Sequence, residues 1–325
     1  MIRNALTNSS APNHPLRGYL SIAVAALCWG AAATLGKAVF TGRLLAGSQA
    51  LRPIDPLVLT QTRVSFALLI LAPLVLARGG RAALSLPPRD VLRCIVLAVL
   101  GVAGSNYFYF YAIAKTTVAT AIILQYTAPV WVLLYLVARR QQRATAQRAI
   151  AVAAAVAGSA LVVGGHLRAN PAGVAAGLGA AFSFAFYNLY GHSLLARLDR
   201  WRVLVYTLLG ATVFWLLVNP PWKLVAARYS GREWGFLLVF SVLSVLLPFS
   251  FYFAGLQYLD ATRAIVTSCL EPVFAMVLAA AFVGESLQPV QAAGIAVVLI
   301  ATVLVQLQSR RGGERPTDVR VSMVE

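Results

Sequence analysis

Apolar stretches long enough to cross a bilayer recur ten times along this chain of 325 residues. A transmembrane helix needs about 20 apolar residues to span the ~30 Å hydrocarbon core, and it satisfies its own backbone polar groups. None of the stretches shows the ten-residue alternation of an outer-membrane strand. The composition, 60% hydrophobic and only 11% charged, also excludes a soluble enzyme. The sequence therefore predicts an all-α integral membrane protein with ten transmembrane helices, at 18–40, 56–77, 91–113, 116–137, 146–165, 171–194, 201–218, 233–254, 260–283 and 288–307.

The net charge of +17 is spread over the connections between these stretches. It forms no basic face with base-stacking aromatic residues, so nucleic-acid binding is excluded. The connections on the side of the two termini hold 17 Lys and Arg residues, and the connections on the other side hold 7. Because positive charges collect on the cytoplasmic side of a membrane, we expect both termini to be cytoplasmic. This predicts a multi-pass protein of a bacterial-type inner (plasma) membrane.

The chain contains an internal duplication. A shift of 143 positions aligns Tyr109 with Tyr252, Ala121 with Ala264, Pro129 with Pro272 and Val130 with Val273. Each half then contains five helices, and an odd number makes the second half enter the membrane from the opposite face. Inverted repeats of this kind are typical of secondary transporters, with the substrate site between the halves. The predicted organisation is a tail at 1–17, a repeat at 18–165, a repeat at 171–307 and a tail at 308–325.

Short motifs in both halves resemble a known family. They are Leu124-Gln125-Tyr126-Thr127-Ala128-Pro129, Leu270-Glu271-Pro272-Val273-Phe274-Ala275, Gly284-Glu285-Ser286-Leu287 and Gln291-Ala292-Ala293-Gly294. In these stretches the chain is similar to the EamA-type transporters of the drug/metabolite transporter superfamily. The resemblance implies two copies of that domain. It also implies a central cavity lined by the third, fourth, eighth and ninth helices, with amino acids and other small metabolites as substrates. The first half departs from the pattern, with Gln142 in place of Glu285.

Ionisable residues within the apolar stretches are the first candidates for a binding site, because each costs ~2.5 to 3.5 kcal/mol to insert. Glu271 lies near the middle of the ninth helix, and a carboxylate there must be protonated, paired or exposed to water. Arg63, in the second helix, could pair with Glu271 or bind a substrate carboxylate. Lys37 and Arg263 lie near helix ends, where they can reach an interface, and Arg263 can also pair with Asp260.

Aromatic and amide side chains supply the remaining candidates. Rings with polar tips suit a pocket for an amphipathic metabolite, and an amide in an apolar helix needs partners. Together with the two charged residues, the candidate substrate-binding set is Arg63, Asn106, Tyr109, Gln125, Tyr187, Asn188, Tyr252 and Glu271.

Catalytic, metal and cofactor motifs are not found in the sequence. The three cysteines have no disulfide or metal spacing and are expected to pack as small apolar residues. The stretch from Gly30 to Lys37 lacks the spacing and the hydroxyl of a phosphate-binding loop. We therefore expect neither enzymatic activity nor a bound cofactor or metal.

The sequence favours a secondary active transporter that moves a small organic metabolite, an amino acid or a similar compound, by alternating access. Export is favoured over import, and protons are the candidate coupling ion. One alternative is an importer of a vitamin or a nucleoside-type cofactor on the same fold. Another is a membrane-embedded enzyme or assembly protein without transport activity. The substrate, the coupling ion and the oligomeric state are not determined by the sequence.

Overall fold

The structure is a computed structural model that describes residues 15–40, 54–116, 118–143, 145–163, 170–283 and 288–311. These residues form helices and short connections, without strands. The helices are α1 (Pro15–Phe40), α2 (Pro56–Gly79), η2 (Arg81–Leu84), α3 (Pro88–Val96), η3 (Leu97–Ala103), α4 (Gly104–Lys115), α5 (Val118–Gln125), α6 (Ala128–Ala138), α7 (Ala146–Val163), α8 (Pro171–Leu195), α9 (Arg200–Val218), α10 (Pro221–Ala226), α11 (Gly231–Ser241), η4 (Val242–Leu246), α12 (Leu247–Leu256), α13 (Ala261–Ser268), α14 (Leu270–Val283) and α15 (Pro289–Arg311).

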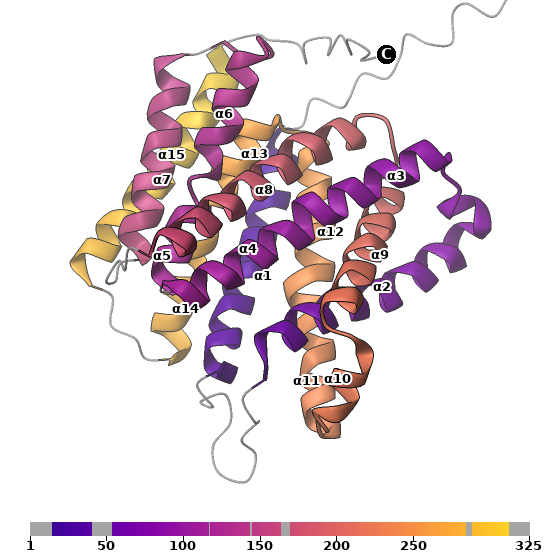
Figure 1. Cartoon of the computed structure of the whole chain (residues 1–325). Coiled ribbons are helices and arrows are strands. Elements are labelled where there is room, and N and C mark those ends of the chain that lie inside the picture. Colours follow the sequence, from indigo (N-terminus) through magenta and orange to yellow (C-terminus); the bar gives the residue numbers. More distant parts are fainter. Residues whose placement is uncertain are drawn as a thin grey trace, which may run out of the picture.

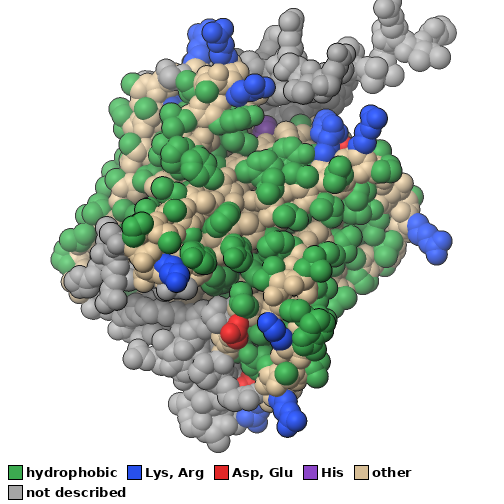
Figure 2. Space-filling view, viewed as in Figure 1, with side chains coloured by type: hydrophobic (Ala, Val, Ile, Leu, Met, Phe, Trp, Pro, Cys, Tyr) green, Lys and Arg blue, Asp and Glu red, His purple; other side chains and the backbone are tan. Residues whose placement is uncertain are grey.

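The described part of the chain contains nine helical stretches long and apolar enough to span a membrane, and α15 adds the shorter apolar stretch Pro289–Leu304. Hydrophobic side chains cover the middle of the face in Figure 2, while Lys and Arg lie mostly toward its margins. The predicted all-α fold with ten transmembrane helices is confirmed. The predicted tails up to residue 14 and from residue 312 lie outside the described residues, as does the motif at residues 284–287.

Short polar residues mark the starts of several helices at the edges of the apolar stretches. Their side chains accept hydrogen bonds of 2.7–3.4 Å from backbone N–H groups in the first turn, which have no partner within the helix. The capping residues are Asp55 for α2, Asn170 for α8, Asp199 for α9, Ser230 for α11 and Asp260 for α13. The sequence therefore encodes these boundaries locally.

The duplication is visible in the positions of the helices. Four pairs of helices start 143 residues apart: α3 and α11, α4 and α12, α5 and α13, and α7 and α15. The third and eighth spans also share an irregularity, because each contains a π-helical segment. These segments, η3 and η4, end at Ala103 and Leu246, again 143 residues apart. The two halves thus repeat the interruptions of their helices as well as the helices themselves.

The two halves interlock. The first helix of the first repeat, α1, packs against α12 and α14 of the second. The first helix of the second repeat, α8, packs against α4, the counterpart of α12, and against α5 of the first repeat. The remaining extensive contacts pair equivalent helices, α2 with α9 and α7 with α15, and α7 and α15 lie side by side in Figure 1. Residues from both halves therefore meet in the interior.

Glycines allow α7 and α15 to approach closely. A Cβ atom at Gly158 would lie 2.8 Å from a side-chain carbon of Val298 and 3.0 Å from the carbonyl oxygen of Gly294. A Cβ atom at Gly294 would lie 2.7 Å from the backbone nitrogen of Val162. Small residues at a crossing let helix backbones pack together in a membrane, where the hydrophobic effect adds little between helices. This crossing cannot accept a larger side chain without separating the two helices.

We expect Gly158→Ala and Gly294→Ala to destabilise the protein by about 1–3 kcal/mol each, because each added methyl group overpacks the crossing. Thermal unfolding of the purified protein in detergent measures this effect. Gly235→Ala is the matched control, since no atom lies within 4 Å of its added Cβ, and its melting temperature should be unchanged or slightly higher. Equal melting temperatures for all three variants would contradict the close crossing.

Candidate functional site

Two transmembrane spans are broken near their middle, and Glu271 lies at one of the breaks. The fourth span divides into α5 and α6 around Tyr126, and the ninth divides into α13 and α14 at Cys269. Pro129 and Pro272 follow the two breaks; each lacks a backbone N–H and so leaves a carbonyl one turn earlier without its helical partner. Glu271 is in the first turn of α14, where the positive end of the helix dipole favours a carboxylate.

The two breaks meet through their side chains. The Tyr126 hydroxyl lies near the Glu271 carboxylate and interacts with it electrostatically. Tyr126 is buried, whereas Glu271 is half-buried and retains accessible surface. The backbone beside it is tightly packed, because a Cβ atom at Gly30 of α1 would lie 2.9 Å from the Glu271 carbonyl oxygen. Glu271 is therefore fixed by contacts with α1 and with the break of the other repeat.

Arg63 reaches the same region from α2. Its guanidinium donates a hydrogen bond to the side-chain oxygen of Asn106 in α4. The Asn106 amide in turn donates to the carbonyl oxygen of Val102, 2.7 Å away in the π-helical segment η3. The remaining Arg63 Nε is buried and has no hydrogen-bond partner among the residues that the structure describes. Arg63 is thus oriented by one bond and retains a donor that is not satisfied.

Arg63 and Glu271 are near one another without being joined. They interact electrostatically with each other, and Tyr109 of α4 interacts with both. Among the described residues, however, no direct hydrogen bond or ion pair links the guanidinium to the carboxylate. Arg63, Asn106, Tyr109, Tyr126 and Glu271 are called the polar cluster below. The cluster holds one basic and one acidic side chain that are not joined by direct contact.

Gln125 lies next to this cluster at the end of α5. Its amide nitrogen donates to the Ser105 hydroxyl at 3.0 Å, and Ser105 lies beside Asn106 in α4. Gln125 is half-buried and Ser105 is buried. The bond ties the broken fourth span to the third, so Gln125 supports the arrangement of the cluster.

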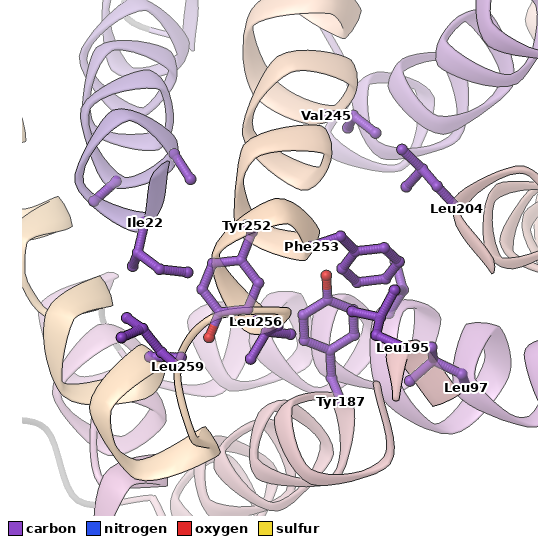
Figure 3. Packing of buried hydrophobic residues seen from close by; sticks show 14 of the residues in the cluster. Ile22, Leu97, Tyr187, Leu195, Leu204, Val245, Tyr252, Phe253, Leu256 and Leu259 are labelled. Carbon is purple, nitrogen blue, oxygen red and sulfur yellow. The ribbon is translucent and has the colours of Figure 1, made fainter. Parts of the chain in front are cut away.

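Three other candidate residues form a separate, fully packed group between α8 and α12. The Tyr252 hydroxyl donates to the side-chain oxygen of Asn188, and the Asn188 amide donates to the Phe184 carbonyl at 3.2 Å. The Tyr187 ring is 5.9 Å from the Tyr252 ring and 5.7 Å from the Phe253 ring, centroid to centroid, as Figure 3 illustrates. Tyr252 and Asn188 are 0% exposed and Tyr187 is 2% exposed. In this conformation the group is part of the core.

The other ionisable candidates lie apart from the polar cluster. Arg263 pairs with Asp260 at 2.9 Å at the start of α13, as the sequence indicated. The side chain of Lys37 lies outside the described residues. The described residues contain no group of three His, Cys, Asp or Glu side chains that could hold a metal ion.

The structure places one further residue in the polar cluster, Tyr126, which the sequence analysis did not include among the candidate substrate-binding residues. The available signal was its position within Gln125-Tyr126-Thr127-Ala128-Pro129, which aligns it with Cys269 at the break of the ninth span. That alignment shows where the breaks occur but not that the two breaks face each other. The partnership of Tyr126 with Glu271 depends on packing between the repeats.

We expect a cysteine at Tyr109 to react with a polar thiol reagent much faster than a cysteine at Tyr252. Tyr109 is half-buried in the polar cluster, whereas Tyr252 is completely buried. Labelling each single-cysteine variant, in a background without Cys28, Cys94 and Cys269, measures the difference. Equal labelling of the two would contradict this arrangement of the interior, and labelling of Tyr252→Cys only when substrate is added would reveal a second conformation.

Comparison with known proteins identifies similar chains. The family description "EamA-like transporter family" matches residues 16–164 and again residues 171–307. The uncharacterized inner membrane transporter YicL of Salmonella typhimurium is 24% identical over 306 residues, which cover 91% of this chain and 97% of YicL. The threonine/homoserine exporter RhtA of Salmonella typhimurium is 28% identical over 218 residues, which cover 65% of this chain and 70% of RhtA. A solved crystal structure superposes with a TM-score of 0.72 at 20% identity, covering 91% of this chain and 98% of that one.

Proposed function

Because this chain belongs to the EamA-like transporter family, we propose that it is a secondary active transporter that exports a small zwitterionic metabolite, an amino acid or a close analogue, by alternating access. The observation that carries the proposal is the pair of ionisable side chains, Arg63 and Glu271, that lie within one polar cluster without a direct bond between them. An α-amino acid presents a carboxylate and an ammonium group, which complement these two side chains. The name of the relative RhtA, a threonine/homoserine exporter, agrees with this substrate class.

The hydrogen-bonding groups support the same substrate class. Arg63 presents a buried Nε donor without a partner, and a planar guanidinium can bind a carboxylate through two parallel bonds. Glu271 can accept bonds from an ammonium group while it stays next to Tyr126. A substrate that bridges the two side chains would compensate the charges of both. Arg63 and Glu271 can do this only if they are not bonded to each other before the substrate binds.

Alternating access is supported by the duplicated irregularities. The helix breaks and the π-helical segments occur at equivalent positions of the two repeats, and the polar cluster takes residues from both. Irregular backbone at membrane depth is tolerated where it is enclosed by protein or lines a water-filled path. We propose that these segments adjust when one repeat moves against the other. The orientation belongs to the same proposal, with both termini on the cytoplasmic side as the positive charges indicate.

We expect Glu271→Gln to fold normally and to lose most transport together with its pH dependence, because an amide carries neither the negative charge nor an exchangeable proton. Uptake and efflux by the purified protein in lipid vesicles, tested first with threonine and homoserine, measures this. Asp90→Asn is the matched control, since Asp90 pairs with Arg93 at 2.8 Å outside the polar cluster, and it should transport normally.

A well-folded Glu271→Gln variant with an unchanged rate and pH profile would overturn the role of Glu271. A loss of membrane abundance instead of transport would indicate a structural role, because a broken buried ion pair costs ~3–5 kcal/mol. We expect little such loss, since Glu271 has no direct bond to Arg63.

We expect Arg63→Gln to reduce kcat/KM for an amino acid about 10- to 100-fold, because a bond to a charged group contributes ~1.5–3 kcal/mol. The corresponding amine, which lacks the carboxylate, should be affected much less. Competition between the two compounds for efflux, in the parent protein and in the variant, measures the difference. A loss of the same size for both compounds would mean that Arg63 does not bind the carboxylate.

A further inference from the structure

A cleft lies apart from the polar cluster and shares no residue with it. Its volume is about 870 Å³, and it lies between α1, α2, α9 and α12. Its walls are apolar and include Leu20, Leu71, Leu74, Leu247 and Phe251. Leu20, Leu74 and Phe251 are exposed, so the cleft is open along its side to whatever surrounds the bundle. In a membrane protein, these surroundings at this depth are lipid chains.

The rim of this cleft carries arginines at one end only. Arg17 of α1, Arg78 at the end of α2 and Arg200 at the start of α9 line it. Arg17 and Arg78 form no hydrogen bond or ion pair with any residue that the structure describes. The guanidinium of Arg200 lies 4.8 Å from the centre of the Trp201 ring, which leaves its charge uncompensated.

The other two charged groups at the rim are already engaged. Arg202 donates to the carbonyl oxygens of Ala83 at 3.0 Å and Ala82 at 3.1 Å. Asp199, the acidic residue among the lining residues, accepts bonds from the backbone N–H groups that begin α9. The rim therefore presents an excess of positive charge in a place where an anion can approach.

The depth of the cleft corresponds to one leaflet. Its lining extends along α12 from Leu247 to Tyr258, just beyond the helix end. At ~1.5 Å per residue this distance is about 16 Å, close to half of the ~30 Å hydrocarbon thickness. The charged rim and the apolar wall are thus separated in the same way as the phosphate and the acyl chains of a phospholipid.

We propose that this cleft binds an anionic phospholipid of the cytoplasmic leaflet, with its phosphate between Arg17, Arg78 and Arg200 and an acyl chain along the apolar wall. Basic pockets between transmembrane helices are suited to anionic head groups. The assignment to the cytoplasmic leaflet rests on the proposed orientation. The lipid would contact α1 and α12, which belong to different repeats, and so it would bridge the two halves outside the substrate path.

Native mass spectrometry of the full-length protein in detergent tests the proposal, with palmitoyl-oleoyl phosphatidylglycerol as the lipid. The double variant Arg17→Gln/Arg78→Gln should bind it about 30-fold more weakly, because each arginine near the head group contributes roughly a factor of five. The matched control is Arg139→Gln/Arg143→Gln, which removes two exposed arginines between α6 and α7 and should bind the lipid as the parent does.

Three results would overturn the proposal. The first is equal affinity for phosphatidylcholine, and the second is equal weakening in the control variant, which would mean that general surface charge is responsible. The third is full competition by soluble glycerol phosphate, which would identify a free phosphate site instead of a lipid site. Lipid binding is measured without transport, so its failure and a failure of the proposed transport activity are distinguishable.

Discussion

The structure depends on one constraint of the bilayer, which is that backbone N–H and C=O groups within the hydrocarbon must find partners in the protein. Continuous helices meet this requirement with bonds four residues apart, whereas the breaks at Tyr126 and Cys269 and the segments η3 and η4 depart from that regular pattern. Such irregular backbone must be enclosed by other helices. The interlocking of the repeats, with α1 against α12 and α14 and α8 against α4 and α5, provides that enclosure. The same packing brings together the side chains next to the irregular segments.

The polar cluster follows from this arrangement. Arg63, Asn106 and Tyr126 come from the first repeat and Glu271 from the second. The charged forms of Arg63 and Glu271 could not be placed singly at this depth without a cost of about 3 kcal/mol each. The hydrogen bond from Arg63 to Asn106 and the electrostatic interaction between Tyr126 and Glu271 compensate part of that cost. The unused Nε of Arg63 and the accessible surface of Glu271 leave capacity for a ligand.

The sequence predicted the properties that depend on contact with lipid. The lengths of the apolar stretches predicted the ten transmembrane spans. Pro129 and Pro272, which are equivalent in the two repeats, lie where the fourth and ninth spans are irregular. The sequence did not reveal the π-helical segments, because one extra residue in a turn leaves hydrophobicity unchanged. It also did not separate Asn106, which bonds to Arg63, from Asn188, which is enclosed with Tyr252 in the core. Both are amides in apolar helices, and only the packing between helices decides which one faces a charged partner.

The π-helical segments have a consequence for how the repeats can vary. In η3, the backbone N–H of Gly104 bonds to the carbonyl of Val99, and in η4 that of Leu247 bonds to Val242, five residues earlier in each case. Each segment therefore accommodates one residue more than an α-helix would, and one residue corresponds to about 100° of rotation. Rewinding of η3 as regular α-helix, with the same residues, would rotate Asn106 and Tyr109 by about 100° away from Arg63, while hydropathy stayed the same. The chain could thus exchange the residues that line the interior by a change of helical phase, without altering any side chain.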